Sequence, residues 1–164
     1  MMDLRQRISD MPEKAFSLDG VSIRPIGCEE DLWYATAECR LAPGQEEFVN
    51  PAGFDIGRAW LCPAENVPCI IRAEGKPIGF ITLRFREKPK PHLGWGYYLD
   101  ARWQGKGWGR TAARLAVSIL KAADRGLAIR LSVEADNLPS QRLCASLGFR
   151  RTEELDGDDL VYLL

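Results

Sequence analysis

The sequence predicts a mixed α/β (α+β) fold built as one domain. Segments rich in apolar and β-branched residues occur in both halves of the 164-residue chain. One long amphipathic helix is expected between the two sets of strands, and the chain closes on a short hairpin. This length is sufficient for one domain with a substantial core, and we expect that domain over residues 20–164.

The first third of the chain combines short strands and helices with an irregular loop. Residues 1–19 have mixed polarity and predict a frayed tail or a short docked helix. Val21 to Gly27 predicts a strand. Acidic residues then favour a helix from Glu29 to about Cys39, and a second helix is expected over Phe54–Leu61. The intervening prolines and glycines predict a surface loop that forms a wall or lid of a substrate entrance.

The middle of the chain predicts a hairpin, a further strand and the long helix. Two apolar runs, Val67–Ile71 and Ile78–Phe85, flank a turn at residues 74–76. Aromatic residues in HLGWGYYLD favour a strand. Gly107 to Asp124 places its apolar residues on one helical stripe, which predicts that this stripe faces the core. The stripe consists of Ala112, Leu115, Ala116, Ile119, Leu120 and Ala123.

The C-terminal part predicts a strand, a short helix and a closing hairpin. Residues 127–133 alternate apolar and polar side chains with a period of two, as a half-buried strand does. Pro139 fits the first turn of a helix that ends at Gly148. The last fifteen residues predict a hairpin around Asp156 and Gly157.

The most informative segment is DARWQGKGWGR, residues 100–110, at the start of the long helix. Gln104, Gly107 and Gly109 have the spacing Q-x-x-G-x-G. A glycine-rich turn at a helix N-terminus exposes backbone N–H groups, and the helix dipole adds partial positive charge there. This segment predicts a pyrophosphate site, although a tight turn without a ligand has the same local sequence.

The loop and a second motif, NLPSQRLCASLGF, resemble the GNAT superfamily of acyl-CoA-dependent N-acyltransferases. The family pattern N-x-x-A-x-x-x-Y-x-x-x-G-F is matched at Asn137, Gly148 and Phe149. Ser140 stands where alanine is usual, and Cys144 where tyrosine is usual. The resemblance implies a six- or seven-stranded, mixed, largely antiparallel sheet with about four helices, in which the fourth and fifth strands splay apart around the thioester.

The resemblance also implies acetyl-CoA as the co-substrate and a set of residues that hold it. Main-chain groups near Leu99 and Ala101 would pair with the pantetheine amides, and Asn137 would contact the cofactor arm. The remaining expected cofactor contacts are Gln104, Gly105, Lys106, Gly107, Trp108, Gly109, Arg110 and Ser140.

Two residues are predicted to move protons during transfer. An alkylamine of pKa about 10.4 is neutral in only about one part in two thousand at pH 7, so a base assists its attack on the thioester. Polyamine-acetylating relatives often carry an acid in the fourth strand, but Trp95 and Gly96 stand there. We therefore expect Glu134 as base, with a solvated carboxylate as the alternative.

Cys144 is the candidate acid for the departing thiolate, because it replaces the family tyrosine and shares a helix face with Ser140. A thiol of ordinary pKa would transfer its proton at little cost. A small packing role is the alternative for this cysteine. Tyr97, Tyr98 and Tyr162 are other hydroxyl candidates, and His92 is expected to be a solvated turn residue.

The expected acceptor is a primary amine, and the sequence points to two kinds. EEFVNPAGFDIGRAW and the acidic C-terminal ending resemble acetyltransferases of diamines, spermidine and spermine, which favours a small polyamine. The stretch Asn137–Arg142 instead resembles the branch that acetylates N-terminal amines of proteins, including ribosomal ones. A non-catalytic acyl-CoA-binding module is the third possibility, since the usual acid and base are absent.

Composition argues against several other classes of protein. A net charge of −1 gives no electrostatic reason for binding nucleic acid or an anionic membrane. Five cysteines without a C-x-x-C pair, and one histidine, predict reduced thiols and no metal site. The charged N-terminal segment and the absence of a long apolar run favour a cytoplasmic protein. The sequence is compatible with a homodimer but does not specify one.

Overall fold

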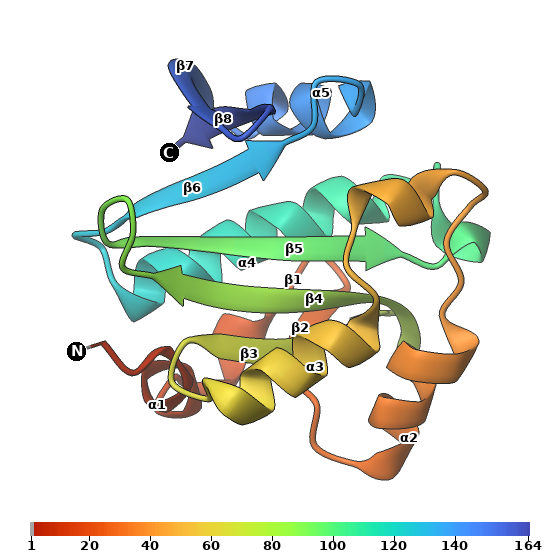
Figure 1. Cartoon of the computed structure of the whole chain (residues 1–164). Helices are drawn as coiled ribbons and strands as arrows, with labels where there is room; N and C mark the ends of the chain where they lie inside the picture. Colours follow the sequence, from red (N-terminus) through yellow and green to blue (C-terminus); the bar gives the residue numbers. More distant parts are fainter. Residues whose placement is uncertain (1) are drawn as a thin grey trace.

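The computed structural model describes residues 2–164 as one mixed sheet covered by helices on both faces (Figure 1). The eight strands have the order β1-β2-β3-β4-β5-β6-β8-β7. They are β1 (Ser17–Leu18), β2 (Val21–Pro25), β3 (Asn66–Ala73), β4 (Lys76–Arg86), β5 (His92–Leu99), β6 (Ala128–Val133), β7 (Arg150–Asp156) and β8 (Asp159–Leu163). Every neighbouring pair is antiparallel except β5 and β6. The mixed, largely antiparallel sheet is therefore confirmed. It has eight strands rather than the expected six or seven, and the two-residue strand β1 lies at one edge.

Residues 2–164 also form five α-helices, where about four were expected, and four shorter helical turns. The α-helices are α1 (Leu4–Ser9), α2 (Glu29–Trp33), α3 (Ala52–Leu61), α4 (Trp108–Ala123) and α5 (Leu138–Ser146). The shorter turns are η1 (Glu13–Phe16), η2 (Tyr34–Glu38), η3 (Gln45–Phe48) and η4 (Ala101–Trp103). The helix expected to run to about Cys39 is α2 followed directly by η2, which is a π-helical segment.

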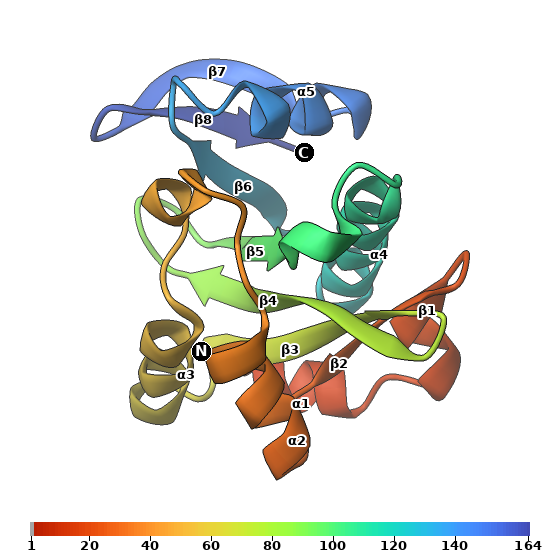
Figure 2. The ribbon, with the colours of Figure 1, turned by 90° about the vertical axis from the view of Figure 1, so that its right-hand side faces the viewer.

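The helices divide between the two faces of the sheet (Figure 2). Helices α1 and α4 cover one face, and α3 covers the other together with η2. The predicted stripe on α4 is confirmed, because all six of its residues are buried in the main core. The first residues of the chain contribute to the same core through Leu4 and Ile8 of α1.

The central strands separate as they run toward the glycine loop. β5 and β6 pair in parallel at only two positions, His92 with Ala128 and Leu93 with Ile129. Figure 1 shows β6 diverging from β5 beyond this point. The splayed fourth and fifth strands that the resemblance implied are thus confirmed, and they are β5 and β6 in the numbering of Figure 1. Turn η4, the glycine loop and the start of α4 lie at the open end of the gap between them.

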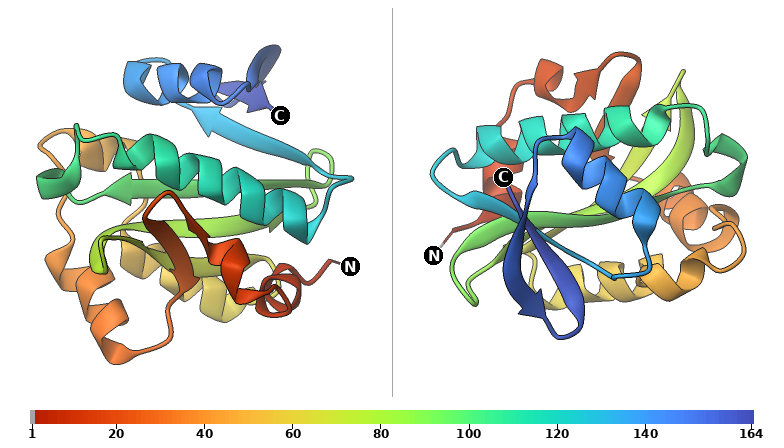
Figure 3. Two further views of the ribbon diagram at one scale, coloured as in Figure 1. Left: turned by 180° about the vertical axis from the view of Figure 1, so that it is seen from behind. Right: turned by 90° about the horizontal axis from the view of Figure 1, so that it is seen from above.

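The last forty residues form the upper part of the molecule in Figure 1. Helix α5 and the β7–β8 hairpin lie beside β6, as Figure 3 shows from behind and from above. The hairpin turn at Gly157 has a φ of +63°, and the predicted alternation along β6 is confirmed by its burial pattern. No helix within residues 2–164 is long and apolar enough to cross a membrane.

Candidate active site

A cleft of about 340 Å³ lies in the gap between β5 and β6. Its wall draws residues from both faces of the sheet, which gives the gap two chemically different sides. On the α4 side lie Trp95, Tyr97, Leu131, Val133, Asn137, Ser140, Leu143, Cys144 and Leu147. On the α3 side lie Glu47, Asn50, Asp55, Phe80, Arg84, Gly96, Tyr98, Ser132 and Asp159.

The edge of β5 that faces the gap presents backbone groups without a strand partner. The N–H of Asp100 donates to the Ile78 carbonyl on β4 at 2.8 Å. Because the peptide bond is planar and trans, the Leu99 carbonyl points the opposite way, into the gap. Backbone groups of alternate residues, Tyr97 and Leu99, therefore face the gap.

The glycine loop ends in an α-helix N-terminus that no side chain caps. Gly105 and Gly107 have φ values of +74° and +87°, and Gly107 is the residue before α4. Since no side chain accepts from the first turn, the N–H groups of Trp108, Gly109 and Arg110 are available to an anion. Lys106 lies over the Trp103 ring, 5.2 Å from its centre, and brings a positive charge to the loop.

Gln104 fixes the loop against its surroundings rather than projecting toward a phosphate. Its Nε2 donates to the Leu99 carbonyl at 2.9 Å and to Gln45 Oε1 at 2.7 Å. Gln45 Nε2 donates back to Gln104 Oε1 at 3.0 Å. The amide of Ala101 is also engaged, because it donates to the Arg40 carbonyl at 2.7 Å. Of the two backbone positions expected to hold pantetheine, Leu99 is the one that faces the gap, but its carbonyl already accepts from Gln104.

Helix α5 brings the second sequence motif to the α4 side of the cleft. Asn137 caps α5, its side-chain oxygen accepting from Ser140 N at 3.2 Å, which leaves its Nδ2 for a ligand. Glu134 lies at the end of β6 and joins Asn137, Ser140 and Cys144 in the cleft wall. Four of the predicted site residues are therefore brought together here, while the glycine loop lies outside this wall.

Cys144 is buried, and burial raises the pKa of its thiol to about 11. The thiol is therefore protonated at neutral pH but is a weaker acid than the sequence argument assumed. Proton transfer to a thiolate of pKa about 8.5 would be uphill by about 3 kcal/mol in the unliganded cleft. Tyr97 is the neighbouring hydroxyl. Its pKa is raised by burial and by Cys144, and its O–H donates to the Gly109 carbonyl at 3.4 Å.

The α3 side of the cleft is built around an ion pair that the sequence analysis missed. Asp55 of α3 accepts from Arg84 Nη2 of β4 at 2.7 Å and, more weakly, from Thr82 Oγ1 at 3.4 Å. Its other oxygen accepts from Asn50 Nδ2 at 3.3 Å. The Asp55 side chain is only 5% exposed, so this carboxylate is held by charge and hydrogen bonds inside the wall.

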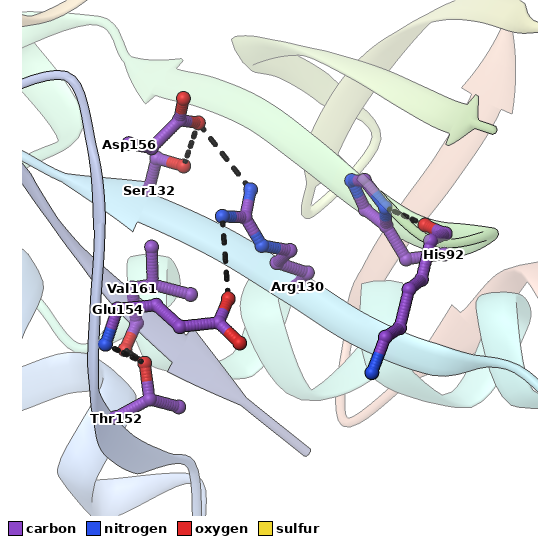
Figure 4. A network of polar contacts seen from close by, with 8 residues as sticks. His92, Arg130, Ser132, Thr152, Glu154, Asp156 and Val161 are labelled. Carbon is purple, nitrogen blue, oxygen red and sulfur yellow. Dashed lines mark hydrogen bonds and ion pairs between the residues drawn. The ribbon is translucent and has the colours of Figure 1, made fainter. Parts of the chain in front are cut away.

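A second polar network borders the cleft at β6 and the C-terminal hairpin (Figure 4). Asp156 accepts from Ser132 Oγ at 2.7 Å and pairs with Arg130 at 3.3 Å. The hydrogen bond from Ser132, followed by Arg130, lowers the pKa of Asp156. Burial, Asp156 and Asp158 raise the pKa of Asp159, which lies in the cleft wall.

The other sequence candidates fall outside the cleft. The expectation of a solvated turn histidine was wrong, because His92 begins β5, is half-buried and pairs with Arg86 of β4. Its Nδ1 lies 2.7 Å from the Lys90 carbonyl, and burial lowers its pKa. Tyr162 is buried in the main core. Among residues 2–164, no three His, Cys, Asp or Glu side chains are grouped so that they could hold a metal ion. All five cysteines are free.

Two sequence signals pointed to the missed residues. Arg84 interrupts the apolar run of β4, FITLRFR, where its neighbours Leu83 and Phe85 are core residues. Gly94 and Gly96 leave alternate positions of β5 without side chains, which is typical of strands that other groups approach closely. Added Cβ atoms at these glycines would meet the Arg130 carbonyl and the Arg84 guanidinium, respectively.

Comparison with curated proteins gives one partial relative. Over 163 aligned positions the chain is 29% identical to a mycothiol acetyltransferase of Pseudarthrobacter chlorophenolicus. The match covers 87% of this chain and 46% of that protein, so the chain spans about half the length of this relative.

Solved structures share the fold at low sequence identity. The GNAT domain of S. lividans PAT superposes with a TM-score of 0.72 at 11% identity, covering 94% of this chain and 99% of that one. Mycobacterium smegmatis RimJ, in complex with CoA-disulfide, superposes with a TM-score of 0.64 at 19% identity, covering 88% of this chain and 81% of that one. The aminoglycoside acetyltransferase AAC(6')-Ib, in complex with ribostamycin and coenzyme A, superposes with a TM-score of 0.70 at 23% identity, covering 88% of this chain and 92% of that one.

The comparison with protein families agrees with the geometry of the gap and the glycine loop. The acetyltransferase (GNAT) family, whose members take acetyl groups from acetyl-CoA, matches residues 31–149. This range includes the loop, α4 and the second motif through Phe149. The chain therefore belongs to the acetyltransferase (GNAT) family.

Proposed function

We propose that this chain transfers an acetyl group from acetyl-CoA to a primary amine by direct attack of the amine on the thioester. The observation that carries the proposal is the gap between β5 and β6. Unpaired backbone of β5 lines one edge of it, and an uncapped helix N-terminus lies at its open end. The unpaired backbone of β5 can hydrogen-bond the amides of a pantetheine arm, and the helix N-terminus can bind a diphosphate.

The two sides of the cleft fit two substrates. The coenzyme would enter along α4 and α5, where Asn137 Nδ2 and the N–H groups after Gly107 are available. The amine would enter from the α3 side. Glu47, Glu134 and Asp159 bring carboxylates to the cleft wall, which favours a cationic acceptor.

Deprotonation of the acceptor falls to a carboxylate of this wall. Glu134 remains the proposed base because it lies at the end of β6, in the wall that also holds Cys144. Cys144 remains the proposed acid for the coenzyme thiolate. Its raised pKa keeps the thiol protonated at neutral pH and makes it a weak acid.

The acceptor is proposed as a small amine. The polyamine favoured by the sequence resemblance is compatible with the three carboxylates. Acetylation of protein N-termini is the other candidate from the sequence. The curated relative is named a mycothiol acetyltransferase, which adds a mycothiol-related amine as a third candidate.

Release of free CoA thiol from acetyl-CoA tests the proposal. The acceptor panel contains spermidine, spermine, peptides with free N-termini, an amino sugar and an aminoacyl amide. We expect amine-dependent release, with acetylated product detected by mass spectrometry. Binding of acetyl-CoA without release on any amine would favour a non-catalytic acyl-CoA-binding module.

A further inference from the structure

The Arg84 guanidinium crosses the floor of the cleft directly over Gly96. A Cβ added at Gly96 would lie 2.8, 3.0 and 3.1 Å from Arg84 Nη2, Nη1 and Cζ. Arg84 pairs with Gly94 and Thr82 with Gly96 in the β4–β5 register, so the side chain of Arg84 reaches two positions along the strands. Only a residue without a side chain leaves room for the guanidinium in this position.

Most donors of this guanidinium are unused within the protein. An arginine carries five N–H donors, and among residues 2–164 Asp55 is the one side chain to which Arg84 donates. Its Nε is buried and has no partner there. The donors of the terminal nitrogens that Asp55 does not use remain for an oxygen of a bound molecule.

Arg130 provides the contrast. Its Nε is also unpartnered, but its two terminal nitrogens lie against Glu154 and Asp156 (Figure 4). Arg130 does not contribute to the cleft wall. Arg84 does, and its side chain is 20% exposed there. Of these two arginines, Arg84 is therefore the one placed to meet a substrate.

The cleft wall holds one ion pair and three further carboxylates. Asp55 and Arg84 compensate each other, and Glu47, Glu134 and Asp159 remain to attract an ammonium group. The guanidinium is a fixed, always-charged donor that repels a bare cation and binds an oxygen.

We propose that Arg84, held over Gly96, selects acceptors whose primary amine is accompanied by a nearby carbonyl, carboxylate or hydroxyl oxygen. Aminoacyl compounds and amino sugars have this pairing, and linear polyamines do not. The inference rests on the proposed function and specifies the acceptor class of the same cleft.

The test compares acceptors that differ in the oxygen. Glycinamide is paired with propylamine, glucosamine with cyclohexylamine, and spermidine is measured beside them. Values of kcat and KM are determined by CoA release for the wild type and each variant. Because every acceptor is compared between variant and wild type, differences in intrinsic amine reactivity cancel.

Two variants disturb the guanidinium in independent ways. Arg84→Met removes it, and Gly96→Ala displaces it while keeping every charge. The displacement is tolerable because the contacted atoms are the far end of a flexible side chain. Arg86→Met is the matched control, since Arg86 lies on the same strand, donates to Asn66 and lies outside the cleft wall.

We expect both Arg84→Met and Gly96→Ala to lower kcat/KM at least tenfold for glycinamide or glucosamine, chiefly through KM, because each loses a charge-assisted hydrogen bond. For propylamine, cyclohexylamine and spermidine, kcat/KM should fall less than threefold or should rise. Arg86→Met should leave kcat/KM for every acceptor at the wild-type value. Equal losses for every acceptor would overturn the role of Arg84, even if Arg84→Met is poorly folded, because Gly96→Ala reports separately. A wild type inactive on every amine would instead overturn the proposed function.

Discussion

Gln45 and Gln104 exchange two hydrogen bonds between their side-chain amides, at 2.7 and 3.0 Å. One residue belongs to η3, beside the α3 side of the cleft, and the other belongs to the glycine loop. Gln104 also holds the Leu99 carbonyl. The acceptor entrance and the coenzyme loop are thus connected by one pair of side chains.

Gln45→Ala should therefore affect both substrates. We expect KM for acetyl-CoA and for the amine to rise about three- to tenfold, because net contributions of neutral hydrogen bonds are about 1 kcal/mol each. Gln6→Ala, which removes an exposed amide bonded to Asp10 on α1, is the control. Steady-state kinetics would contradict the connection if only one KM changed.

Gly107→Ala tests the coenzyme loop. Gly107 has a φ of +87°, and an alanine there is strained by about 1–2 kcal/mol, although its Cβ would meet no atom within 4 Å. We expect acetyl-CoA affinity, measured by calorimetry, to fall at least tenfold. Gly20→Ala has the same strain at φ +79° in an open turn. If both variants lost affinity equally, the loop would have no specific role.

Cys144→Ala tests the proposed acid. We expect kcat to fall about tenfold, at the low end of general-acid effects, because burial makes this thiol a weak acid. An acid must be protonated to act, and a pKa of about 11 keeps the thiol protonated as pH rises through 9. The wild-type kcat should therefore show no alkaline decline between pH 7 and 9. A decline centred near 8.5, or an unchanged kcat in the variant, would remove Cys144 from the mechanism.

Asp100→Asn tests the support of the loop. Asp100 is fully buried and accepts from Arg102 N and from the Arg102 guanidinium, whose hydrogen bonds lower the Asp100 pKa. A lowered folded-state pKa gives stability that is present above about pH 4 and is lost as pH falls through the folded value. In urea unfolding, the variant should be less stable at pH 7, with the difference shrinking in acid. A difference independent of pH would exclude this ion pair as its source.

Gly94→Ala tests how closely β6 approaches β5 where the two strands part. A Cβ would lie 2.6 Å from the Arg130 carbonyl, a backbone atom that cannot move away alone. We expect a loss of about 1–3 kcal/mol in unfolding free energy. Gly53→Ala in α3, where a Cβ meets nothing within 4 Å, should instead gain up to about 1 kcal/mol. Similar effects at both sites would contradict the close approach.

The sequence predicted the features that depend on local periodicity. The stripe on α4 and the alternation on β6 follow from side-chain direction alone, and both are confirmed by burial. The loop glycines were identified by their spacing, and Gly105 and Gly107 have the positive φ angles that favour glycine. Second-motif residues such as Asn137 and Cys144 reached the cleft because one short helix carries both.

The acceptor side depended on contacts that no local pattern encodes. Arg84 meets Gly96 across the β4–β5 register, and Asp55 reaches them from a helix 29 residues earlier in sequence than Arg84. The expected role of the Ala101 amide was missed for a similar reason. This amide donates to the carbonyl of Arg40, which is remote in the chain. Such pairings appear only when register and helix placement are known.

A structure of the protein with acetyl-CoA tests the central claim most directly. We expect the diphosphate within hydrogen-bond distance of the N–H groups of residues 105–110, and the thioester between β5 and β6 beside Cys144. An acetyl-CoA molecule bound elsewhere, with the glycine loop and the gap both empty, would contradict the account.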